Sequence, residues 1–198
     1  MDREEAMALL REHTKNEGLI KHALAVEAAM RHLAAKAGED VEAWGLAGLL
    51  HDLDYEEHPD PAEHSLKGAE ILRARGVPAE IVDAVRAHND HHGLPRETRL
   101  AKTLYAVDEL CGFITAVALV KGKDLHAVTP KSVKKKLKDK AFARKVNREE
   151  IQRGMEELGV ERDAFFQEVI EGMCAAAERL GLAGASGAGG EAAGEAGA

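Results

Sequence analysis

The stretch WGLAGLLHD, residues 44–52, sets a histidine and an aspartate directly after seven residues that carry no charge. The apolar residues of this stretch predict a segment that enters the core, so His51 and Asp52 are expected at the edge of that core. A carboxylate buried there costs several kcal/mol unless it is paired or binds a metal. The His51-Asp52 pair therefore indicates a metal site.

Two long predicted helices each carry a further ligand-type side chain within an apolar face. His22 shares one face of a helix over residues 18–37 with leucine, valine and methionine side chains. Asp108 occupies a position in a helix over residues 99–120 where an apolar residue would pack better. Both side chains fit ligands of the same metal site.

Two later histidines occupy comparable positions. His64 is followed one turn later by Gly68, which leaves space beside the imidazole, and His88 continues the helical spacing of the apolar residues before it. His91 or His92 could take the place of His88. A single histidine on an apolar face is usually a hydrogen-bonded core residue, but several of them with two aspartates would leave polar groups unsatisfied unless they converge on a metal. The candidate metal ligands are His22, His51, Asp52, His64, His88 and Asp108.

The order and helical setting of these ligands resemble the HD-domain superfamily of metal-dependent phosphohydrolases. The signature is a histidine, a His-Asp doublet and a distant aspartate, which here are His22, His51-Asp52 and Asp108. The later histidines look like those that dinuclear members add. The resemblance covers about residues 18–120 and implies an all-α HD-domain helical bundle. No Gly-Tyr-Pro follows the later histidines, which argues against the cyclic-dinucleotide phosphodiesterases of the superfamily.

The ligand types also predict the metal and its chemistry. Mixed histidine and carboxylate ligands favour a divalent transition metal, Mn, Fe, Co, Ni or Zn, over Ca or Mg. One or two ions are expected, with Asp52 bridging them if both bind. Such an ion lowers the pKa of a water molecule, which then attacks phosphorus as the nucleophile.

The resemblance therefore implies a hydrolase, a metal-dependent phosphohydrolase acting on a nucleotide or another small phosphate ester. Asp54, Glu56 or Glu57, which follow the doublet, are candidates for protonating the leaving group, and the predicted catalytic residues are Asp52, Asp54 and Glu56. Two alternatives stay open. One is a di-iron oxygenase of the HD type, and the other is a non-catalytic metal-containing module that senses a phosphorylated ligand.

A basic segment lies in the second half of the chain. Residues 121–148 contain eleven Lys or Arg residues against two Asp residues, although the formal net charge of the whole chain is −8. We expect this segment to reach the metal site and to bind substrate phosphate through Lys131, Lys135 and Arg148. A solvated helical face is the alternative. Nucleic acid is not the expected partner, because the segment offers only Phe142 for base stacking.

Turn and capping residues divide the remaining chain into further helices. These are predicted from Pro61, with His64 near the first turn, from Pro78 to His88, from Asn147 to Leu158 and from Asp163 to Leu180.

Helical spacing dominates the chain, so one all-α domain is predicted over residues 1–183, with the motif core at about 18–120 and a basic helical extension at 121–183. Residues 184–198 contain only Gly, Ala, Ser and Glu and predict a disordered tail. Neither a membrane-spanning stretch nor a signal peptide is evident, so a cytoplasmic protein without a membrane partner is expected. The sequence does not indicate an oligomeric state.

Overall fold

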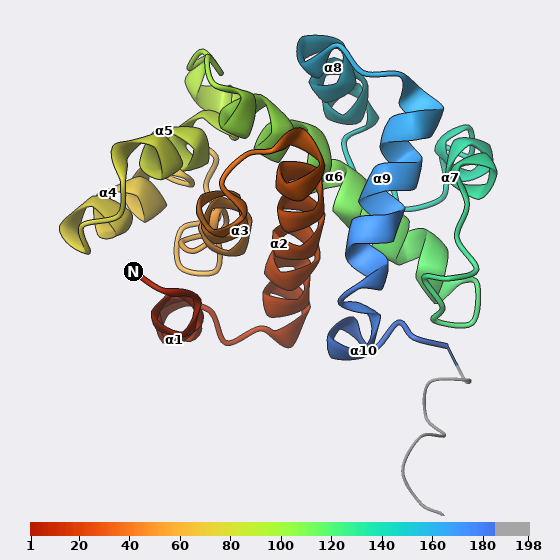
Figure 1. Cartoon of the computed structure of the whole chain (residues 1–198), viewed down its shortest axis with the longest axis horizontal. Coiled ribbons are helices and arrows are strands. Elements are labelled where there is room, and N and C mark those ends of the chain that lie inside the picture. The colour runs from red at the N-terminus through yellow and green to blue at the C-terminus, as the bar shows by residue number, and fades with distance from the viewer. Residues whose placement is uncertain (185–198) are drawn as a thin grey trace, which may run out of the picture.

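The computed structural model describes residues 1–184, and within them the chain is all-helical (Figure 1). This confirms the predicted fold class. No helix in the described part of the chain is both long and apolar enough to cross a membrane. Apart from Gly184, the tail predicted at residues 184–198 lies outside the described residues. The α-helices are α1 (Arg3–His13), α2 (Glu17–Ala37), α3 (Val41–Leu50), α4 (Leu66–Ala74), α5 (Ala79–Ala87), α6 (Arg99–Leu119), α7 (Pro130–Leu137), α8 (Arg148–Leu158), α9 (Arg162–Cys174) and α10 (Ala177–Leu180).

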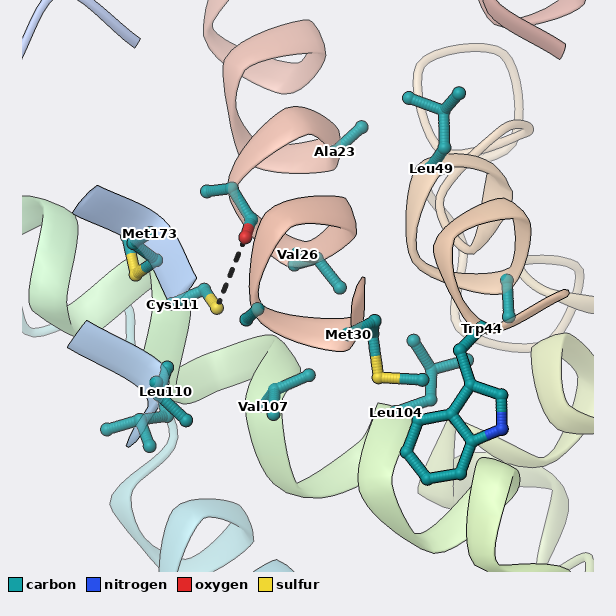
Figure 2. Close-up of a cluster of buried hydrophobic side chains, with 14 of the residues drawn as sticks. Ala23, Val26, Met30, Trp44, Leu49, Leu104, Val107, Leu110, Cys111 and Met173 are labelled. Carbon is teal, nitrogen blue, oxygen red and sulfur yellow. Dashed lines mark hydrogen bonds between the residues drawn. The ribbon is translucent and has the colours of Figure 1, made fainter. Parts of the chain in front are cut away.

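Two long helices, α2 and α6, organise the molecule. In Figure 1, α2 runs through the centre, with α3, α4 and α5 on one side and α7 and α9 on the other, while α6 crosses behind it. The core lies where α2, α3, α6 and α9 meet, and Figure 2 shows Val26, Met30, Trp44, Val107 and Met173 in it. Of the predicted metal-site residues, four lie on or directly after α2, α3 and α6, whereas His64 and His88 border α4 and α5.

Helix α3 lies unusually close to α2. A Cβ atom on Gly48 would come within 2.9 Å of the backbone nitrogen of Glu27, which is closer than real Cβ contacts. The missing side chain therefore allows this approach. Because His51 follows Gly48 by three residues, the contact brings its imidazole next to α2 and thus next to His22.

Two predicted helix boundaries were wrong. Residues 61–65 form turns, and α4 begins only at Leu66. Ser65 has φ of 68°, a left-handed conformation that cannot continue a helix, and its hydroxyl donates to the backbone oxygen of Arg86. The helix predicted to end at Leu180 is divided into α9 and α10 after Cys174. His64 therefore projects from a turn that is tied to the end of α5.

Candidate metal centre

The six side chains predicted as ligands meet at one place, although they come from five segments of the chain. His22 lies on α2, His51 and Asp52 follow α3, His64 precedes α4, His88 follows α5 and Asp108 lies on α6. The convergence joins helices that are far apart in sequence.

Asp52 lies between two groups of histidines. Its Oδ2 atom is 3.3 Å from Nε2 of His51 and 3.8 Å from Nε2 of His22. Its Oδ1 atom is 3.3 Å from Nε2 of His64 and 3.4 Å from Nε2 of His88. Each oxygen of one carboxylate thus faces a different pair of imidazoles.

Asp108 completes the first group. Its Oδ1 atom is 2.9 Å from Nε2 of His22 and 3.4 Å from Nε2 of His51. In the second group, the Nε2 atoms of His64 and His88 are 3.2 Å apart. Ligand atoms that lie within 4.8 Å of one another form two triads here, His22, His51 and Asp108, and His51, Asp52 and His88.

The outer nitrogens of two histidines are held by backbone oxygens. Nδ1 of His51 donates to the backbone oxygen of Gly48 over 2.8 Å, and Nδ1 of His88 donates to the backbone oxygen of Val85 over 2.6 Å. Because a carbonyl oxygen only accepts hydrogen bonds, Nδ1 carries a proton in both rings, and Nε2 is the nitrogen that remains for a metal ion. The Nε2 atom of His51 is buried and has no hydrogen-bond partner. A buried imidazole nitrogen without a hydrogen-bond partner, beside two carboxylates, fits a ligand of a divalent cation.

The charges of the cluster also fit a cation. Burial alone would lower the pKa of His51, but the carboxylates of Asp52 and Asp108 hold it well above its usual value. Burial likewise opposes the shift at His64, and the carboxylates of Asp52 and Asp54 raise its pKa to about 9. For Asp108, burial favours the neutral acid, yet neighbouring His51 holds its pKa well below the usual range. The carboxylates therefore stay ionised and attract positive charge to this point.

The sequence from residue 19 to residue 112 matches the HD domain family and includes all six clustered side chains. The chain contains an HD domain. Ribonuclease Y of Nitratidesulfovibrio vulgaris (strain DP4) is 34% identical over 98 residues, which are 49% of this chain and 18% of that protein. Ribonuclease Y of Lawsonia intracellularis (strain PHE/MN1-00) is 34% identical over 97 residues, 48% of this chain and 18% of that protein. This chain thus spans about a fifth of the length of these relatives. No solved structure matches it.

Two of the acids predicted to protonate a leaving group, Asp54 and Glu56, are held by other parts of the chain. Asp54 is fully buried, and its oxygens contact Nδ1 of His64 at 3.0 Å and the backbone nitrogen of Gly68 at 2.7 Å. Glu56 accepts hydrogen bonds from the backbone nitrogens of Lys15 and Asn16. The structure therefore places Asp54 behind His64, and a proton-donor role for either acid stays a prediction.

The three residues predicted to bind substrate phosphate, Lys131, Lys135 and Arg148, do not lie among the six clustered side chains. Lys131 and Lys135 line a different cavity beneath α7. The guanidinium of Arg148 donates to backbone oxygens of the loop that precedes it and of α7, those of Leu137, Asp139, Phe142, Ala143 and Val146. These backbone oxygens occupy the guanidinium of Arg148, and binding of substrate phosphate by the three residues stays a prediction.

A cavity of about 300 Å³ opens above the cluster, and we call it the metal-site cavity. His88, rather than His91 or His92, lines it, and Nε2 of His92 instead contacts the backbone oxygen of His64 at 2.8 Å. The lining residues that sequence reasoning missed are Tyr55, Asn89, Asp90, Glu109, Gly112 and Glu150. No Lys or Arg is among the described lining residues. Glu109 could have been found from its place directly after Asp108, whereas nothing near Glu150 in the sequence connects it to the ligands.

Proposed function

We propose that the protein is a metal-dependent phosphohydrolase that acts on a nucleotide or another small phosphate ester. The observation that carries this proposal is the position of Asp52 between two groups of histidines at the base of a cavity. Structural metal sites are usually closed by four protein ligands, whereas a site that adjoins a cavity has room for substrate.

In this proposal His22, His51, Asp52 and Asp108 bind one ion, and Asp52, His64 and His88 bind a second. When bound, divalent transition-metal ions would lower the pKa of water and neutralise charge on phosphoryl oxygens.

The protein's own residues prepare the site for this chemistry. The backbone oxygens of Gly48 and Val85 fix the imidazoles of His51 and His88, and Asp54 fixes the imidazole of His64. Such partners hold ligands in one orientation and tautomer. Substrate would enter through the metal-site cavity and place its phosphoryl group against the Asp52 end.

Asn89 supports the same arrangement from the rim of the cavity. Its Nδ2 donates to the backbone oxygens of Pro61 and His64 and so ties the turn that carries His64 to the end of α5. This contact holds the ligands of the second ion at a fixed separation.

The name of the curated relatives adds one class of substrate to be tested. They are called ribonucleases, and RNA is joined by phosphodiester bonds. A substrate screen should therefore include mononucleotides, dinucleotides and short RNA together.

The test is a phosphate-release and cleavage screen on protein purified without chelators, with metal content measured on the same sample. The proposal predicts turnover of at least one phosphate ester, loss of turnover after chelation, and loss of about 100-fold or more in Asp52→Asn. Metal-replete protein that hydrolyses none of these esters but consumes oxygen would support the oxygenase alternative. Metal-replete protein with neither activity would support a non-catalytic module.

A further inference from the structure

The rim of the metal-site cavity is acidic, and part of it comes from outside the HD-domain span. Glu109 on α6 and Glu150 on α8 both line the cavity, as does Asp90 in the segment after α5. Helix α8 lies beyond residues 19–112. A residue of the basic helical extension, residues 121–183, therefore lines the opening through which substrate would pass.

The three acids differ in how their charge is balanced. Asp90 is neutralised, because its Oδ1 accepts from Arg96 at 2.9 Å and its Oδ2 accepts from Arg153 and from the hydroxyl of Tyr105. Arg96 and Arg153 are thus turned to Asp90 and not to substrate. This acid contributes little net charge to the cavity.

Glu109 and Glu150 have no such partner. Each accepts from Asn147, whose backbone nitrogen is 3.0 Å from Glu109 Oε2 and whose Nδ2 is 2.5 Å from Glu150 Oε1. Neither carboxyl group forms an ion pair with a Lys or Arg within residues 1–184.

The position of Glu150 is set by close helix packing. Gly154 follows it by one turn, and a Cβ atom there would lie 2.6 Å from Cα of Ala106 on α6. Only a glycine allows this approach, which holds the first turn of α8 against the cavity. Glu150 is therefore a fixed part of the rim.

An independent observation shows that the same cavity is built for a ligand. At its base, the fully buried Nε2 atom of His51 has no hydrogen-bond partner and lies 3.3 Å from Asp52 and 3.4 Å from Asp108, two residues that line the cavity. A phosphoryl group held at this end would leave the rest of the substrate at the rim. The leaving group of the substrate would therefore lie beside the acidic residues of the rim.

We propose that Glu150, together with Glu109, selects phosphate monoesters whose leaving group is neutral or positively charged and carries hydrogen-bond donors. Carboxylates only accept hydrogen bonds, so they favour hydroxyl or ammonium groups and repel additional phosphates or carboxylates. The inference rests on the proposed phosphohydrolase function. It makes a monophosphate a better substrate than a polyphosphate of the same alcohol.

The experiment compares two phosphate esters of similar size and opposite charge at the far end, 4-(aminomethyl)phenyl phosphate and 4-carboxyphenyl phosphate. Phosphate release gives kcat/KM for each ester with metal-replete wild-type protein, Glu150→Gln and Glu149→Gln. Glu149 is the matched control, because it lies on the same helix and carries the same charge but is exposed and does not line the cavity.

The wild type is expected to favour the cationic ester by about tenfold, the factor that one charge pair in a partly buried site can supply. Glu150→Gln should lower that preference by about threefold or more, and Glu149→Gln should leave it within about twofold. Equal rates for both esters in the wild type, or equal effects of the two variants, would overturn the inference while leaving the phosphohydrolase function intact. Hydrolysis of neither ester or any nucleotide would overturn both.

Discussion

Replacing Gly154 with alanine tests how tightly α8 is held against α6. The added Cβ would lie 2.6 Å from Cα and 3.0 Å from Cβ of Ala106, whereas carbon atoms in contact prefer about 3.5 to 4.0 Å. Relieving such overpacking costs about 1 to 3 kcal/mol. Alanine also stabilises a helix by about 0.5 to 1 kcal/mol relative to glycine, which offsets part of this cost.

Gly112 offers a matched control for the propensity term. It also lies inside a helix, α6, but a Cβ atom there would meet nothing within 4 Å. Gly112→Ala should therefore stabilise the protein, and the difference between the two variants should equal the overpacking cost of about 1 to 3 kcal/mol.

The assay is thermal unfolding of metal-replete wild type and both variants, followed by circular dichroism. A domain of this size shifts its Tm by about 2 to 4 °C per kcal/mol, so Gly154→Ala should melt at least about 2 °C below Gly112→Ala. Equal shifts in the same direction would refute the reasoning, because they would show that α8 moves away from α6 at no cost.

Three further predictions concern His64, which belongs to the second group of histidines, and the basic segment. Asp54→Asn should lower metal affinity by about 10-fold to 100-fold at the site that includes His64, as measured by metal titration, because the orienting carboxylate is lost. In metal-free protein, the pKa of His64 is raised from 6.5 to about 9, so its contribution to stability is complete below about pH 6.5 and is lost as pH rises through 9; thermal unfolding from pH 6 to 10 should show this loss, and His64→Gln should reduce it. Arg148→Ala should lower stability by about 2 to 4 kcal/mol in denaturant unfolding, because it leaves several backbone oxygens without a donor, whereas Lys135→Ala should change stability by less than about 0.5 kcal/mol.

Local sequence was sufficient to predict most of the helices and to place the candidate metal ligands on or beside them. The apolar spacing around His22 and Asp108 places these side chains on inward faces of α2 and α6, and both faces meet in the structure. His51 could be predicted at the edge of the core because it directly follows the buried residues of α3. In each case the position of the side chain depends on its own helix.

The rest of the site depends on contacts that the sequence does not contain. Glu150 reaches the cavity because Gly154 packs on Ala106, a contact between helices far apart in the chain. Arg148 belongs to a run of positive charge, and charge alone does not distinguish a guanidinium that binds phosphate from one that binds backbone oxygens. Asp54 follows Asp52 by two residues, yet its direction is set by its contact with His64 in the turn before α4.

The central claim is that one carboxylate, Asp52, serves two metal positions, and metal stoichiometry tests it most directly. Elemental analysis of metal-replete protein should give two ions per chain in the wild type, one in His64→Ala, and loss of most bound metal in Asp52→Ala. One ion per chain in the wild type that His64→Ala leaves unchanged, or full metal content in Asp52→Ala, would contradict the claim.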